Sequence, residues 1–113
     1  MAEQTKEKRI AKERRRLLKI FKDLEPNKLD TCKALISRAA FITVSLEDLE
    51  EQLNETGWVE TYQNGENQVG MKQSAAASVH ISLTKNLNAI IKQLLELVPP
   101  AQKKSKLTEM MGR

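Results

Sequence analysis

Apolar residues recur at helical spacing in three long segments of the chain. The first segment, from Thr5 to Leu24, contains no Gly or Pro and is rich in strong helix formers. Its apolar residues come late, and Leu17, Phe21 and Leu24 form one stripe along a helix. We therefore predict a helix whose second half docks against the rest of the protein and whose first half projects or frays.

A second and longer helix is predicted after Pro26, which ends the first helix and suits the first turn of the next. Apolar residues then advance by steps of three and four for more than 25 residues. The β-branched residues around Val44 leave a kink there open. We expect one helix to about Glu55, with Gly57 after its end as the stop.

The pattern changes in residues 57–73. Trp58 and Tyr62 favour extended structure, and Asn64-Gly65 is a turn signal. A short hairpin or an ordered loop is the economical interpretation. The chain's single Trp and single Tyr lie here, so we expect this loop to pack onto the helices or onto a neighbouring subunit.

The third helical segment begins at Ser74, a good N-cap, and stops at Pro99-Pro100. Its apolar residues repeat as in a seam that packs against another long helix at a shallow crossing angle. The residues assigned to this core, or to contacts between subunits, are Leu46, Leu49, Leu53, Trp58, Tyr62, Leu83, Leu87, Ile90 and Leu94. With only 4% aromatic residues the core is thin, so we expect other copies to complete part of the stripe.

These patterns predict a mainly α protein, with a basic N-terminal helix and a long antiparallel helical hairpin joined by a short extended or β-like loop. The predicted parts are the basic helix at 1–24, the hairpin core at 25–98 with its loop at 57–73, and a flexible basic tail at 99–113. Met110 and Met111 leave open that the tail docks as a short amphipathic turn.

Composition bounds the kinds of protein that this chain can be. With 113 residues, 40% apolar and 30% charged, it suits one compact domain and is neither disordered nor membrane-spanning. Its apolar stretches are far shorter than the roughly 18–20 residues of a transmembrane span. The Lys- and Glu-rich start has no apolar signal-peptide region, so we expect a soluble cytoplasmic protein without membrane partners.

The formal net charge of +4 conceals three regions of different sign. Residues 1–22 hold nine basic and three acidic residues, a charge of +6. Residues 23–71 hold three basic and ten acidic residues, and residues 72–113 hold seven basic and two acidic residues. This asymmetry points to a polyanionic partner or to charge pairing between protomers.

Eight cations crowd into positions 6–19 of the first helix. Each cation that meets a phosphate releases counterions, so such a helix binds double-stranded DNA with strong salt dependence and little sequence preference. No aromatic residue is interleaved for base stacking, and no helix-turn-helix pattern is evident. The predicted DNA-binding residues are Lys6, Lys8, Arg9, Lys12, Arg14, Arg15, Arg16 and Lys19.

Catalytic and metal chemistry has little support. Cys32 and His80 are the single cysteine and the single histidine, which excludes a disulfide and a zinc site built from Cys and His. Both lie on apolar helical faces, which favours core positions over a nucleophile pair. The segment 65–74 departs from the phosphate-binding G-x-x-x-x-G-K-S/T loop because Met71 and Gln73 interrupt it. We predict no catalytic residue, metal, cofactor or enzymatic activity.

An acidic run in the second helix comprises Glu47, Asp48, Glu50, Glu51 and Glu55. Like charges stand four residues apart with leucines between them, which is typical of the solvated face of an amphipathic helix. Such a face also suits contact with a basic surface of a neighbouring copy.

Five segments, in their order and spacing, resemble phage terminase small subunits and similar small phage proteins of Gram-positive hosts. They are 37–41 (SRAAF), 46–49 (LEDL), 62–70 (YQNGENQVG), 72–76 (KQSAA) and 90–94 (IIKQL). The resemblance covers about residues 17–98, and its most specific part is the loop between two long helices. The chain differs from some relatives in ending with Pro99-Pro100 and a Lys-rich tail instead of a Gly-Leu-Thr-Pro-like segment.

The resemblance implies a part in DNA packaging. It implies that the protein collects or recognises viral DNA, forms a ring-like homo-oligomer and regulates a separate large terminase subunit that holds the ATPase and nuclease. A helical hairpin at the oligomer interface and a location in the host cytoplasm are implied as well. The alternative is a phage structural or protein-interaction component without DNA binding, in which the basic end of one copy meets the acidic face of another.

Overall fold

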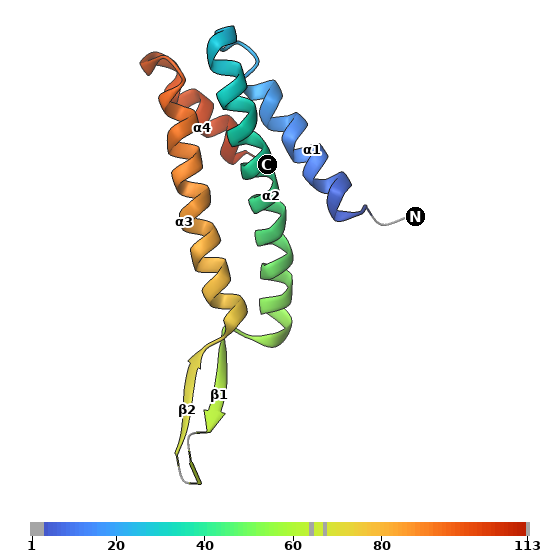
Figure 1. The fold of residues 1–113 in the computed structure, drawn as a ribbon, viewed down its shortest axis with the longest axis vertical. Helices are drawn as coiled ribbons and strands as arrows, with labels where there is room; N and C mark the ends of the chain where they lie inside the picture. The colour runs from blue at the N-terminus through green and yellow to red at the C-terminus, as the bar shows by residue number, and fades with distance from the viewer. Residues whose placement is uncertain (1–3, 64, 67, 113) are drawn as a thin grey trace.

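The computed structural model describes residues 4–63, 65–66 and 68–112. Within them the chain forms four α-helices, one short 3-10 helix and one two-stranded sheet. In chain order the elements are α1 (Lys6–Ile20), α2 (Pro26–Thr56), β1 (Val59–Gln63), β2 (Val69–Gln73), α3 (Ala75–Glu96), η1 (Pro100–Gln102) and α4 (Lys103–Met111). The predicted mainly α fold, with a basic helix beside a long helical hairpin, is confirmed (Figure 1).

The long helices α2 and α3 run antiparallel and form the body of the molecule (Figure 1). α2 continues through Val44 as one helix of 31 residues. It ends at Gly57, whose φ of 85° lies in the left-handed region that glycine adopts at least cost. Ser74 caps α3, because its hydroxyl accepts a hydrogen bond from the Ala77 N–H at 3.1 Å.

The core lies in the half of the hairpin that is distant from the sheet. Ile36 and Leu94 are fully buried there, and α1 adds Leu17 while the turn after it adds Phe21. The buried cluster is Leu17, Phe21, Cys32, Ile36, Ala39, Ile42, Leu46, Ile90, Leu94, Val98 and Met110. Because one cluster draws on all four α-helices, the packing that closes the hairpin also holds α1 in place.

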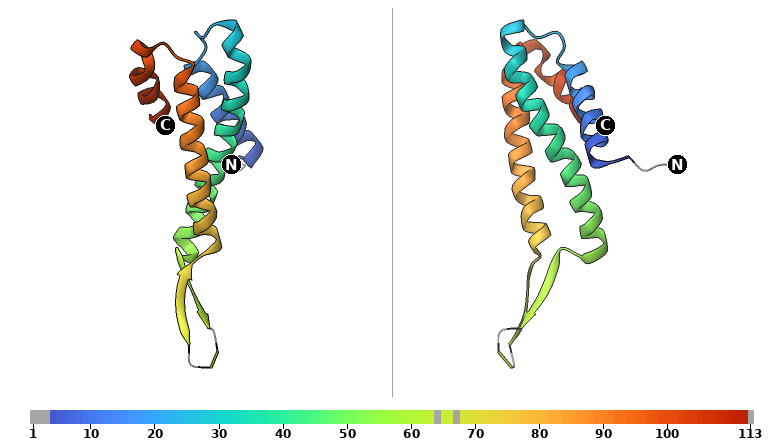
Figure 2. Two further views of the ribbon diagram at one scale, coloured as in Figure 1. Left: turned by 60° about the vertical axis from the view of Figure 1, so that its left-hand side comes forward. Right: turned by 45° about the vertical axis from the view of Figure 1, so that its right-hand side comes forward.

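The connection between α2 and α3 is a β-hairpin, termed the ribbon, made of β1 and β2. The strands pair antiparallel, with Tyr62 opposite Gly70. The ribbon projects beyond the ends of both long helices, and all its strand residues except half-buried Gly70 are exposed (Figures 1 and 2). At its tip Gly65 has a φ of 94°, as a tight turn requires, whereas Asn64 of the predicted turn lies outside the described residues.

The C-terminal segment corrects the prediction of a flexible tail at 99–113. It forms η1 and α4, and α4 lies against α1 (Figure 2). Met110 is 4% exposed, whereas Met111 is 59% exposed, so one methionine of the pair docks in the core. Pro99 and Pro100 end α3 without preventing a new helix, and the residues that cover Met110 come from elements distant in the sequence.

Candidate nucleic-acid interface

α1 presents one face to the core and the opposite face to solvent. Its start is capped by Thr5, whose hydroxyl accepts a hydrogen bond from the Lys8 N–H at 3.1 Å. Leu17 and Phe21 point into the core, so the other side of the helix is left to solvent. On that side four cations follow at steps of four, three and four residues, one for each turn. These residues, termed the outer stripe, are Lys8, Lys12, Arg15 and Lys19.

The outer stripe has no partner within the described part of the chain. All four side chains are exposed, and none of them makes an ion pair or a side-chain hydrogen bond with another described residue. At about 1.5 Å per residue the stripe extends about 16 Å along α1. Lys22, exposed in the turn after α1, follows at the same spacing and was not among the predicted residues.

The expectation that the first half of α1 projects or frays is wrong, because Arg9 binds this half to α2. Its guanidinium donates to Asp48 of α2 at 2.6 Å and lies 3.5 Å from Glu47. The hydrogen bond to Asp48 raises the pKa of the Arg9 guanidinium. One turn earlier, the Lys6 ammonium lies 4.9 Å from the centre of the Phe41 ring. The beginning of α1 is therefore held to α2 by charge, which apolar periodicity cannot reveal.

Arg16 is also engaged inside the molecule. It donates from Nε and one terminal nitrogen to the two carboxylate oxygens of Glu13, at 2.7 and 3.1 Å. Both terminal nitrogens also donate to main-chain carbonyls at the end of α4, to Glu109 at 3.1 Å and to Met110 at 2.9 Å. Glu13 is only 4% exposed. Arg16 thus neutralises a buried carboxylate and caps a helix C-terminus, where a cation is favourable.

The eight predicted cations therefore divide into two groups. Lys6, Arg9 and Arg16 contact other parts of the chain. The remaining five are exposed, and they are Lys8, Lys12, Arg14, Arg15 and Lys19. Helical geometry places Arg14 to one side of the outer stripe, on the flank nearer to Phe21.

The predicted seam divides in a similar way. Four of its residues are buried within one chain and close α2 on α3, namely Leu46, Leu53, Ile90 and Leu94. Three more, Leu49, Leu83 and Leu87, are half-buried. The two aromatic residues of the seam, Trp58 and Tyr62, are 45% and 43% exposed. Most of the seam is thus the core of the hairpin itself.

Cys32 and His80 lie too far apart to act together. The His80 Nε2 lies 3.6 Å from Glu50, and its ring packs edge to face on Trp58 with centroids 5.2 Å apart. Cys32 precedes Glu50 by eighteen residues of α2, about 27 Å along a helix. Cys32 is also buried, and this burial raises the pKa of its thiol. The geometry does not support a Cys–His nucleophile.

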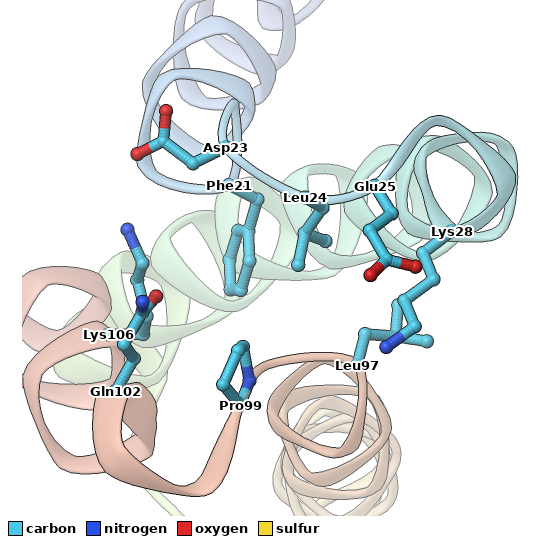
Figure 3. A pocket seen from close by; sticks show the side chains of 9 residues that line it. All are labelled: Phe21, Asp23, Leu24, Glu25, Lys28, Leu97, Pro99, Gln102 and Lys106. Atoms are coloured by element: carbon cyan, nitrogen blue, oxygen red, sulfur yellow. The ribbon is translucent and has the colours of Figure 1, made fainter.

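A cavity of about 200 Å³ opens between the turn that joins α1 to α2 and the segment that runs from the end of α3 through η1 to α4 (Figure 3). Phe21 and Leu24 point into it from one side and Pro99 from the other (Figure 3). The Lys106 ammonium at its edge donates to the Ile20 carbonyl at 2.7 Å. The cavity is smaller than the roughly 300–1,000 Å³ typical of ligand sites. Among the described residues, no cluster of His, Cys, Asp or Glu is suited to hold a metal ion.

The helices in the described ranges are too short or too polar to cross a membrane. Among the features described above, the outer stripe has the clearest chemistry for a partner, and that chemistry is the binding of an anion.

Comparisons with protein-family models, with curated proteins and with solved structures found no match to this chain.

Proposed function

We propose that this protein is a non-enzymatic viral DNA-packaging protein, similar to phage terminase small subunits, that binds the backbone of double-stranded DNA through α1. The observation that carries the proposal is the outer stripe: one exposed cation on each turn of α1, none of them neutralised by another described residue. In this proposal several copies assemble and together regulate a separate large terminase subunit in the host cytoplasm.

The physical basis is the release of counterions. Double-stranded DNA carries one negative charge for about every 1.7 Å of its axis, and each cation that meets a phosphate releases a condensed counterion. A helix docked on the core holds its cations in fixed positions, which reduces the entropy lost on binding. Since phosphate contacts carry no base information, binding is expected to depend little on DNA sequence.

The resemblance supports the packaging role, because its most specific segment, residues 62–70, falls in the connection between two long helices. The proposal also narrows the predicted set of DNA-contact residues. Arg9 and Arg16 serve the fold, so the proposal assigns the DNA contacts to the outer stripe with Arg14 and Lys22 at its margins.

Neutralising three residues of the outer stripe tests the proposal. Two triple variants are compared. The stripe variant carries Lys12→Gln, Arg15→Gln and Lys19→Gln. The control variant carries Lys33→Gln, Lys85→Gln and Lys92→Gln, which remove the same charge from exposed positions of α2 and α3. Affinity for a duplex is measured by fluorescence anisotropy at several salt concentrations. The stripe variant should bind at least about tenfold more weakly, and its slope of log K against log salt should fall by about 2.7.

The control variant should keep both the wild-type affinity and the wild-type salt slope. Equal losses in the two variants would show that only net charge matters, and the outer stripe would then have no special role. Unchanged affinity in the stripe variant would remove the assignment altogether.

The second candidate is a phage structural or protein-interaction component without DNA binding. The contact of Arg9 with Asp48 and Glu47 favours it, because the basic and acidic regions are seen to neutralise each other in part. Absence of any duplex binding at low salt would favour this candidate over the first.

A further inference from the structure

The two faces of the ribbon differ in chemistry. Side chains alternate between the faces along a strand, so residues with even numbers share one face and residues with odd numbers share the other. Within the strands, the even face carries Glu60, Tyr62, Gly70 and Lys72. The odd face, termed the uncharged ribbon face, carries Val59, Thr61, Gln63, Val69, Met71 and Gln73.

The even face is satisfied by contacts within the ribbon. Glu60 and Lys72 stand opposite each other and form an ion pair at 3.5 Å. The Tyr62 ring covers Gly70 so closely that an added Cβ would come within 2.8 Å of it. Each charge on this face therefore has a neighbour of opposite charge, and the aromatic ring has a surface to lie on.

The uncharged ribbon face has no such cover. Met71 is 69% exposed, Val69 is 67% exposed and Val59 is 51% exposed, and the first two exceed every other large hydrophobic side chain of the described residues. A two-stranded ribbon on its own is only marginally stable in water. A projecting ribbon whose uncharged face exposes Val59, Val69 and Met71 is thus expected to gain stability from a partner that covers these side chains.

The whole molecule also exposes more surface than its mass requires. Its accessible surface is 8124 Å², whereas a globular monomer of this mass has about 6,300 Å². Its radius of gyration is 18.2 Å, against about 13 Å for a compact chain of this length. The surplus of about 1,800 Å² exceeds the about 800 Å² that each partner buries in a standard protein interface.

We propose that the uncharged ribbon face packs against the same face of a second copy of this chain. This inference rests on the assembly part of the proposed function and names the surface by which two copies pair; a two-fold contact closes on two copies, so the ring that the resemblance implies would need a further contact. A two-fold contact uses the same patch on both copies, so a face without charge meets another face without charge and no uncompensated charge is buried. DNA is a poorer occupant, because the face offers no cation to a phosphate and Lys72 lies on the opposite face beside Glu60.

The test compares two methionines of similar exposure. Met71→Lys, alone and with Val69→Lys, places charge in the proposed contact, and Met111→Lys places the same charge on α4. Molar mass is measured by light scattering after size exclusion over a range of protein concentrations, in the absence of DNA. Wild type and Met111→Lys should assemble, whereas the ribbon variants should associate at least about tenfold more weakly. Circular dichroism checks that the helices are retained, as expected for side chains that are mostly exposed.

A cross-linking experiment tests the geometry of the contact. Because Cys32 is buried, Met71→Cys supplies an exposed thiol. Thr61 and Met71 form the central pair of the ribbon register, so a two-fold axis through the middle of the face brings position 71 of one copy near position 71 of the other. Mild oxidation should therefore convert Met71→Cys to a covalent dimer, and Met111→Cys should stay largely unlinked.

Three results would overturn the inference. They are a monomeric wild type at all concentrations, a Met71→Lys variant that assembles as the Met111→Lys variant does, and equal cross-linking of the two cysteine variants. Loss of duplex binding by Met71→Lys without a change in mass would instead assign the face to DNA, since added positive charge should otherwise strengthen binding. These measurements of mass do not depend on the outer stripe, so this inference and the DNA-binding proposal can fail separately.

Discussion

Arg16 shows that a cation in a basic run can stabilise the fold instead of facing a partner. In the sequence it is the third of three consecutive arginines, and nothing distinguishes it from Arg14 and Arg15. In the structure it joins the buried Glu13 carboxylate to the last carbonyls of α4. The difference arises because a helix turns about 100° with each residue, so adjacent residues meet different surroundings.

Replacing Arg16 with alanine is predicted to destabilise the protein. The Glu13 carboxylate, 4% exposed, would lose its guanidinium partner, and the Glu109 and Met110 carbonyls of α4 would lose the guanidinium as a donor. The expected loss in the free energy of unfolding is about 2–4 kcal/mol, measured by urea denaturation. Arg15→Ala serves as the control and should leave stability nearly unchanged because Arg15 is exposed. Equal stability of the two variants would contradict the structural role of Arg16.

At the scale of elements, α4 and α1 hold each other by reciprocal contacts at their ends. Lys106 of α4 donates to the carbonyl of Ile20, the last residue of α1, and Arg16 of α1 donates to the end of α4. Both cations lie where the helix dipole is negative. Met110 of α4 is buried in the shared core. α4 therefore braces the helix that carries the outer stripe.

Truncation of Met110 tests that bracing. Met110→Ala should lower the free energy of unfolding by about 2–4 kcal/mol, because it leaves a cavity in the shared core. Met111→Ala is the matched control and should have little effect, since Met111 is 59% exposed. Thermal unfolding followed by circular dichroism distinguishes the two, and a Met110→Ala variant as stable as the wild type would argue against docking of α4.

The elements differ in how well local sequence predicts them. The helices of the hairpin and their ends follow from apolar spacing, from Ser74 and from Gly57, whose effects are local. The ribbon follows from its extended residues and its turn, although its projection into solvent does not. α4 was not predicted as a helix, because its only buried residue, Met110, is covered by distant parts of the chain.

At the scale of the whole molecule, the charge regions partly neutralise each other within one chain. Arg9 of the basic region lies against Asp48 and Glu47 of the acidic region. From the sequence alone, Arg9 could equally well contact DNA, and Asp48 and Glu47 could equally well contact a neighbouring protomer. In the structure these three residues contact one another within one chain. The outer stripe is left as the part of the basic region that faces solvent.

Salt should therefore separate the two proposed contacts. Raising NaCl from about 50 mM to about 500 mM should abolish duplex binding, because phosphate contacts depend on counterion release. Assembly through the uncharged ribbon face should persist, since burial of apolar surface is not screened by salt. Light scattering and fluorescence anisotropy over the same salt series provide the check. Dissolution of the assembly by salt would instead favour electrostatic pairing between protomers.

The sequence by itself determined the three longer helices, the position of the ribbon and the concentration of positive charge at the N-terminus, because each depends on residues near one another in the chain. Only the tertiary structure decided which cations remain free, that Met110 is core, and that Val69 and Met71 have no cover. These properties depend on the neighbours that folding brings to each side chain. Lys8 and Arg9 illustrate the point: adjacent in sequence, one faces solvent and the other is bound to α2.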